Sequence, residues 1–158
     1  MVKECFKVNV QWSIFSAKVI GMQPDKQAPA APAPAGRKIL CIEDEHFIAE
    51  LYERALKKAG YEVTTLIDGL EGLKAAQTDQ YDIILLDLMV PTMTGIEILR
   101  RLRDTRQTPR FRGKIIITTN LEQREEVRAD IEAQADGYIV KAEVTPRELV
   151  EFLSTVKA

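Results

Sequence analysis

Three carboxylate side chains in this sequence come directly after short apolar segments. Glu43 and Asp44 follow the segment 39–42, and Asp87 follows the segment 83–86. Two carboxylates about 4 Å apart repel each other by roughly 4 kcal/mol at an effective dielectric constant near 20. Acidic groups placed where a buried segment ends are therefore unfavourable unless a cation balances their charge.

Hydroxyl and ammonium groups stand at the ends of two further apolar segments. Thr118 and Thr119 end the segment 114–119, and Lys141 follows the segment 137–140. If these segments are neighbouring parallel strands, their carboxyl ends share one edge of a sheet, which is where ligands bind in such folds. The acids, a hydroxyl and an ammonium group would then surround one site.

The charges at this edge indicate a metal ion. Glu43, Asp44 and Asp87 contribute −3 and Lys141 contributes +1, so a divalent cation would balance the sum. Oxygen ligands with space for water favour Mg²⁺ over a transition metal. The residue types therefore predict a magnesium site.

Strand and helix patterns alternate through the segment that carries these residues. Apolar or alternating segments predict strands, and apolar residues at helical spacing, with Asp68 and Thr145 as candidate N-caps, predict helices. The expected strands are 37–42, 61–67, 81–87, 114–119 and 137–140, and the expected helices are 46–59, 68–77, 95–104, 121–134 and a last one that begins near residue 145.

Five β–α units of this kind predict an α/β fold. Apolar strands that alternate with helices form a parallel sheet covered by helices on both faces. We expect a flavodoxin-like, doubly wound sheet of five strands in the order 2-1-3-4-5. In that order strands one, three, four and five are neighbours, which brings the polar strand ends together.

Composition limits the size and class of the protein. A chain of 158 residues, 46% of them hydrophobic, can form one well-packed domain but hardly two. The net charge of −2 gives no overall basic character, so general nucleic-acid binding is not expected. Cys5 and Cys41 form no zinc or disulfide pattern, which favours a reducing, cytoplasmic location.

The first part of the chain differs from the rest. Residues 1–23 are irregular and too often interrupted by polar residues to span a membrane, and residues 28–36 form an Ala/Pro-rich stretch typical of a linker. We expect a leader and linker over residues 1–36 and a folded domain over residues 37–158.

The motifs at the strand ends resemble those of a known family. They are "ED" at 43–44, "DLMVPTMTG" at 87–95, "TTN" at 118–120 and "YIVK" at 138–141. In this order, and each at a strand end, they resemble the response-regulator receiver domain of two-component signalling. The resemblance covers nearly the whole chain after the linker.

The resemblance implies a role for each matching residue. Asp87 resembles the phosphoacceptor, which takes a phosphoryl group from a phosphohistidine in a step that needs Mg²⁺. Glu43 and Asp44 resemble the acids that hold the metal together with Asp87, and the backbone carbonyl of Met89 is a further expected ligand. Lys141 resembles the lysine that pairs with the acyl phosphate.

Two further residues resemble the conformational switch of the family. Thr119 matches the hydroxyl residue that moves toward the phosphoryl group, and Tyr138 matches the aromatic residue that follows this movement. Thr119 is preferred over Thr118 because alternation points the two side chains in opposite directions. The spacing from Thr119 to Lys141 also fits the family.

The resemblance also implies partners. A sensor histidine kinase or a histidine phosphotransfer protein would be the phosphodonor, and a target protein would bind the face made by the fourth helix, the fifth strand and the fifth helix. No output domain follows the fifth expected helix, so we expect a stand-alone receiver without direct DNA or membrane binding. Its only chemistry would be self-catalysed phosphotransfer and dephosphorylation, so it is not expected to be an enzyme.

The sequence departs from the family pattern at three places. Glu43 stands where aspartate is usual, and Ala142 follows Lys141 where proline is usual. Because a cis bond before a residue other than proline costs about 2.5–4 kcal/mol, we expect a trans Lys141–Ala142 bond. The Lys141 nitrogen then either still lies within roughly 4 Å of Asp87 or points away from it, and the charge of the three acids favours the first outcome. The segment 100–114 is long and basic, which favours a solvated patch over a site for an acidic partner or nucleic acid.

Two other classes use related chemistry or the same fold. A haloacid-dehalogenase-like phosphatase needs a second acid two residues after its nucleophile, but Met89 occupies that position. A flavin-binding electron carrier needs a phosphate-binding loop after the first strand, where Glu43, Asp44 and Glu45 would repel a phosphate. Both alternatives are weaker than the receiver interpretation.

Overall fold

The computed structural model describes residues 36–120 and 125–157. The expected leader and linker, and the first four residues of the expected helix 121–134, lie outside the described residues, so the domain boundary stays a prediction. The described strands are β1 (Lys38–Ile42), β2 (Glu62–Leu66), β3 (Ile83–Asp87), β4 (Lys114–Thr119) and β5 (Gly137–Val140), and the helices are α2 (His46–Lys58), α3 (Gly69–Ala76), α4 (Gly95–Arg103), α5 (Glu125–Gln134) and α6 (Pro146–Thr155).

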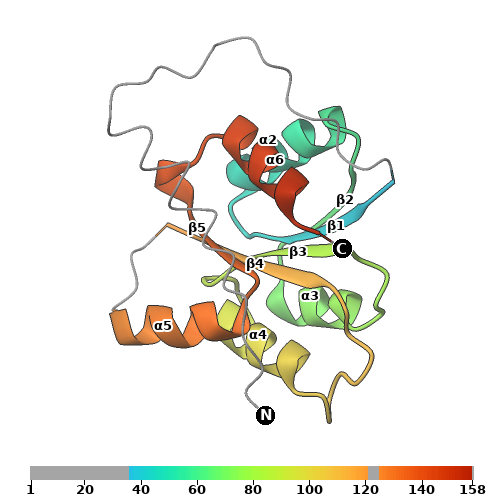
Figure 1. The fold of residues 1–158 in the computed structure, drawn as a ribbon, viewed down its shortest axis with the longest axis vertical. Coiled ribbons are helices and arrows are strands. Elements are labelled where there is room, and N and C mark those ends of the chain that lie inside the picture. Colours follow the sequence, from blue (N-terminus) through green and yellow to red (C-terminus); the bar gives the residue numbers. More distant parts are fainter. Residues whose placement is uncertain (1–35, 121–124, 158) are drawn as a thin grey trace.

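The strands form one parallel sheet in the order β2-β1-β3-β4-β5, as expected from the sequence. In this flavodoxin-like arrangement β3 is the central strand, with β1 on one side and β4 on the other (Figure 1). The register pairs Ile42 of β1 with Leu86 of β3, and Asp87 of β3 with Thr118 of β4. The polar strand ends therefore lie at one edge.

Helices cover both faces of the sheet. Successive side chains of a strand point to opposite faces, and here they enter two separate apolar cores. One core lies under α3, α4 and α5, and the other lies under α2 and α6 (Figure 1). The mainly apolar sequences of β1, β3 and β4 fit strands that are buried on both faces.

Local signals set several helix ends. Asp68 accepts hydrogen bonds from the first turn of α3, and Thr94 and Thr145 each form a reciprocal capping box with the glutamate three residues later. Gly60, just after the end of α2, has a φ of +98°, which glycine adopts without steric cost.

The loop between β3 and α4 packs on the first turn of α3. The Gly69 nitrogen donates to the Pro91 oxygen at 3.0 Å, and the Leu70 nitrogen donates to Thr92 Oγ1 at 3.1 Å. A Cβ atom at Gly69 would lie 2.1 Å from the Met93 oxygen, so only glycine permits this approach. The loop that follows Asp87 is therefore held by α3 as well as by its own turn.

The basic segment 100–114 lies at the amino end of β4, opposite the carboxyl ends of the strands. Four of its seven cations face carboxylates, which supports the expectation of a solvated patch. The pairs are Arg100 with Asp130, Arg103 and Lys114 with Asp136, and Arg106 with Asp104.

The two ends of the domain meet at the amino side of the sheet. Arg37 directly precedes β1, is buried, and donates from Nη1 to the Val156 oxygen at 2.7 Å, just beyond the end of α6. Among the described residues, no helix has the length and apolar character needed to cross a membrane.

Candidate phosphorylation site

A buried lysine joins two buried acids at the carboxyl edge of the sheet. Lys141 Nζ lies 2.5 Å from Glu43 Oε2 and 2.7 Å from Asp87 Oδ2. Glu43 follows β1, Asp87 ends β3 and Lys141 follows β5, so three strands position the group. All three residues are less than 10% exposed, which leaves their charges little stabilisation from water.

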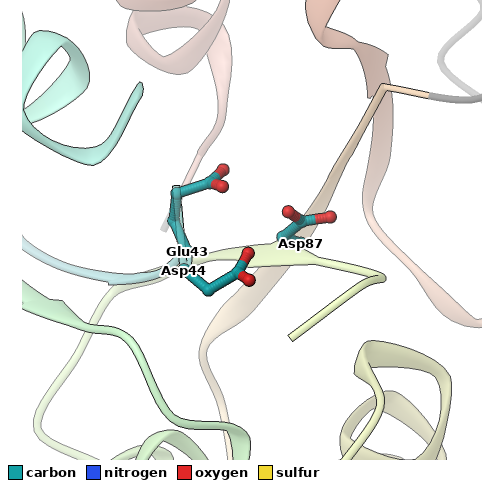
Figure 2. A group of neighbouring side chains, drawn as sticks. All are labelled: Glu43, Asp44 and Asp87. Atoms are coloured by element: carbon teal, nitrogen blue, oxygen red, sulfur yellow. The ribbon is translucent and has the colours of Figure 1, made fainter. Parts of the chain in front are cut away.

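Asp44 completes a group of three carboxylates. One carboxylate oxygen from each of Glu43, Asp44 and Asp87 lies within 4.8 Å of the others, and Asp44 is the exposed member. Figure 2 shows that the Glu43 and Asp44 side chains extend from the end of β1 toward the side of Asp87. Oxygen donors at this spacing, partly open to water, fit a hard divalent cation such as Mg²⁺.

The backbone around Asp87 is tightly fixed. Asp87 Oδ1 accepts a hydrogen bond from the Met89 nitrogen at 3.1 Å, and Oδ2 contacts Lys141. Gly95, at the start of α4, packs directly behind the aspartate, since a Cβ atom there would lie 2.2 Å from the Asp87 backbone oxygen. Both carboxylate oxygens and the backbone of Asp87 are thus held in place.

Burial and charge shift two pKa values in the site. Burial raises the pKa of Glu43 from 4.5 to about 7; the Asp87 charge adds to this shift and Lys141 opposes it. Burial alone would lower the pKa of Lys141, but its hydrogen bonds to Asp87 and Glu43 outweigh burial and raise this pKa above its usual value. The lysine stays charged while Glu43 titrates near neutral pH.

The two expected switch residues lie on β4 and β5. Thr118 and Thr119 are both buried. Alternation along β4 places Thr119 on the face of Ile115 and Ile117, and Tyr138 packs against the same core. Thr119 and Tyr138 therefore share the face covered by α3, α4 and α5, and the switch roles of both residues stay predictions.

Arg128 of α5 reaches the expected switch tyrosine. Its guanidinium carbon lies 5.0 Å from the centre of the Tyr138 ring. Contacts of this kind attract through the ring's negative face. The tyrosine is thus linked to α5, one element of the expected docking face.

The expected trans bond after Lys141 and the expected contact of Lys141 with Asp87 are both confirmed. No cis peptide bond occurs among the described residues, so Lys141–Ala142 is trans, and the Lys141 nitrogen is 2.7 Å from Asp87. After β5 the chain forms a short 3-10 turn over Lys141–Glu143, which the sequence patterns did not indicate.

One contact at the site was not expected from the sequence. Asn120 Nδ2 donates to Glu45 Oε1 at 2.6 Å, and the same oxygen lies 3.9 Å from Lys141 Nζ. The motif "TTN" contained Asn120, but no periodic pattern connects it with a glutamate 75 residues earlier. The two residues come together because the loops after β1 and β4 lie at the same edge of the sheet.

A family comparison agrees with this geometry. The family model described as "Response regulator receiver domain" matches residues 39–154. The chain belongs to this family. The receiver match favours the two-component interpretation over the phosphatase and flavin-carrier alternatives.

Individual proteins similar to the receiver include response regulators and chemotaxis proteins. Response regulator ArlR of Staphylococcus saprophyticus is 40% identical over 121 residues, which make up 77% of this chain and 51% of that protein. The structure of chemotaxis protein CheY4 of Vibrio cholerae has a TM-score of 0.65 and 32% identity, and the match covers 78% of this chain and 100% of that one.

A third similar structure contains a metal. The receiver domain of sensor histidine kinase PA1611 of Pseudomonas aeruginosa has a TM-score of 0.64 and 28% identity, over 75% of this chain and 95% of that one. It is described with a magnesium ion coordinated in its active-site cleft. The receiver spans about half the length of the curated relatives that it matches, and its expected stand-alone architecture stays a prediction.

Proposed function

We propose that this receiver accepts a phosphoryl group on Asp87 from a phosphohistidine of a sensor kinase or phosphotransfer protein. The observation that carries the proposal is the position of Asp87. It ends the central strand, contacts Lys141 at 2.7 Å, and lies beside Glu43 and Asp44. A carboxylate held between an ammonium group and two further acids suits acyl phosphate formation.

The transfer joins a carboxylate oxygen of Asp87 to phosphorus. As this bond forms, the phosphorus–nitrogen bond of the donor breaks, and its electron pair leaves on the imidazole. The Met89 nitrogen keeps Oδ1 oriented, and Lys141 supplies positive charge close to the incoming phosphoryl oxygens. Catalysis in this scheme is mainly positioning and charge stabilisation.

Glu43, Asp44, Asp87 and the Met89 carbonyl would hold Mg²⁺, which supplies charge neutralisation for the phosphoryl oxygens when bound. Three carboxylate oxygens within 4.8 Å of one another support this assignment, as does the magnesium ion of the PA1611 receiver. The raised pKa of Glu43 means that metal must compete with a proton near neutral pH.

Phosphorylation would be read out through Thr119 and Tyr138. Both residues lie on the core face under α5, and Arg128 links the tyrosine ring to that helix. Movement of Thr119 toward a phosphoryl group would then change the packing of α5. The face formed by α5, β5 and α6 would bind a target protein, and direct contact with DNA or a membrane is not part of the proposal.

Labelling with acetyl phosphate tests the proposed function. With Mg²⁺, the protein should gain one phosphoryl group, and peptide mass spectrometry should locate it on Asp87. Asp87→Asn should abolish the label, whereas Asp130→Asn, at an exposed aspartate of α5, should retain it. Full labelling of Asp87→Asn, or labelling indifferent to EDTA, would contradict the proposal.

A further inference from the structure

A hydrogen bond connects two loops on the solvent side of the phosphorylation site. Glu45 lies between β1 and α2, and Asn120 directly follows β4. Asn120 Nδ2 donates to Glu45 Oε1 at 2.6 Å, and this oxygen is 3.9 Å from Lys141 Nζ. Glu45 is therefore a further carboxylate beside Lys141, additional to Glu43 and Asp87.

The Glu45 side chain does not cap the helix that follows it, α2. Glu45 occupies the N-cap position of α2, where a side-chain oxygen often accepts from the first turn, yet it makes no such bond. Its side chain is 50% exposed, compared with 1% for Glu43 and 5% for Asp87. Among the carboxylates that contact Lys141, Glu45 is thus the outermost, and Asn120 holds it there.

We propose that the Glu45–Asn120 pair makes the site selective for the charge of small phosphodonors, a proposal that rests on the proposed function of Asp87. A negative charge on the solvent side repels an incoming anion, and a doubly charged donor is repelled more than a singly charged one. The pair thereby slows self-phosphorylation by small dianions.

Two small donors with different charges separate this effect from the transfer chemistry. Acetyl phosphate is mainly a dianion above neutral pH, whereas phosphoramidate carries a single net negative charge near pH 7. In both reactions an Asp87 oxygen bonds to phosphorus. The phosphorus–oxygen bond of acetyl phosphate breaks and its electron pair leaves on acetate, while the phosphorus–nitrogen bond of phosphoramidate breaks and its pair leaves on ammonia.

The test compares initial rates of Asp87 labelling by the two donors at saturating Mg²⁺. Glu45→Gln removes the charge but keeps an oxygen that can accept from Asn120. We expect labelling by acetyl phosphate to become about five-fold faster and labelling by phosphoramidate at most about two-fold faster. Asn120→Ala, which releases the carboxylate without removing it, should give a smaller change in the same direction.

Salt and a distant charge provide the controls. The advantage of Glu45→Gln should shrink as ionic strength rises, because screening weakens a charge effect and leaves a steric one unchanged. Glu62→Gln, at the amino end of β2, changes the net charge equally and should not alter the ratio of the two rates.

Two results would overturn the inference. One is that Glu45→Gln accelerates labelling equally with both donors, and the other is that its advantage with acetyl phosphate does not change with ionic strength. Failure of the proposed function would look different, since neither donor would then label Asp87 in the unmodified protein.

Discussion

Lys141 and Asp87 form a buried ion pair, 2.7 Å between Nζ and Oδ2, and the same ammonium group lies 2.5 Å from Glu43. One cation thus compensates for two buried anions that come from β1 and β3. When one partner of a buried pair is removed, the uncompensated charge left behind costs about 3–5 kcal/mol. The chemistry of the site and the stability of the sheet edge therefore depend on the same side chain.

Replacing this lysine should destabilise the protein most at alkaline pH. We expect Lys141→Met to lower the free energy of unfolding by about 3 kcal/mol at pH 8, because Glu43 and Asp87 then lose their shared cation. At pH 5.5 the loss should be smaller, since burial raises the pKa of Glu43 to about 7 and this carboxyl group is then mostly protonated. Urea unfolding at both pH values measures this, with Lys58→Met of α2 as an exposed control. An equal loss at both pH values would contradict it.

Glu43 should make stability depend on pH between about 4.5 and about 7. Its pKa is raised from 4.5 to about 7 in the folded protein, so over this interval the folded state binds more protons than the unfolded state. The stability contribution is therefore present below pH 4.5 and is lost as pH rises through 7. Without metal, the melting temperature of the unmodified protein should fall more steeply over this range than that of Glu43→Gln. Parallel curves would contradict the assignment.

Magnesium affinity should follow the same titration. Mg²⁺ binds the ionised carboxylate, so its affinity should rise as pH passes from about 6 to 8, where Glu43 loses its proton. Isothermal titration calorimetry at several pH values would measure this, and the heat should vary with the buffer because protons are released. An affinity that is constant across this range would contradict the assignment of Glu43 as a ligand that titrates near pH 7.

Gly95 should tolerate no side chain. A Cβ atom there would lie 2.2 Å from the Asp87 oxygen and 2.7 Å from the Leu88 Cα, and backbone atoms cannot move aside cheaply. We expect Gly95→Ala to cost about 2–3 kcal/mol of stability and to slow labelling of Asp87. Gly72→Ala is the matched comparison, because the nearest atoms to its Cβ belong to a side chain, that of Ile42, and not to the backbone, and it should cost less. Equal losses in urea unfolding would contradict this reasoning.

The acyl phosphate should be long-lived. Its hydrolysis needs a water molecule in line with the phosphorus–oxygen bond, and the Met89 side chain, two residues after Asp87, cannot orient that water by a hydrogen bond. We also expect Asn120, which directly follows β4, to crowd the approach of that water. We expect a phosphorylated state that lasts minutes or longer, and a shorter one in Met89→Asn. Decay of the purified phosphoprotein measures it, and loss of the label within seconds would refute the prediction.

The sequence was sufficient to predict the sheet and the residues at its carboxyl edge, because both depend on local signals. Apolar runs mark β1, β3 and β4, and Asp87 and Lys141 stand where such runs end. Strand ends of a parallel sheet must share an edge, so the convergence of these residues follows from topology. The proximity of Lys141 to Asp87 needed one further step, which is that three acids without a nearby cation would be poorly balanced.

Side-chain contacts between distant loops could not be predicted in the same way. The Glu45–Asn120 bond depends on the rotamers of two polar residues that no pattern connects. Thr92 has a φ of +66°, although a branched residue disfavours this conformation. Its Oγ1 accepts from Leu70 of α3, so contacts made across the fold outweigh its local preference. Such features depend on contacts between loops that are distant in the sequence, and composition and periodicity do not reveal these contacts.

The bond from Arg37 to Val156 bears on how this receiver can be joined to other proteins. Since it connects the start of β1 with the end of α6, segments attached at residues 37 and 156 leave the domain close together. Both leave from the amino side of the sheet, far from Asp87 at the carboxyl side. A short linker between these positions should permit a circular permutant, and insertion into a surface loop of another protein should leave the phosphorylation site accessible.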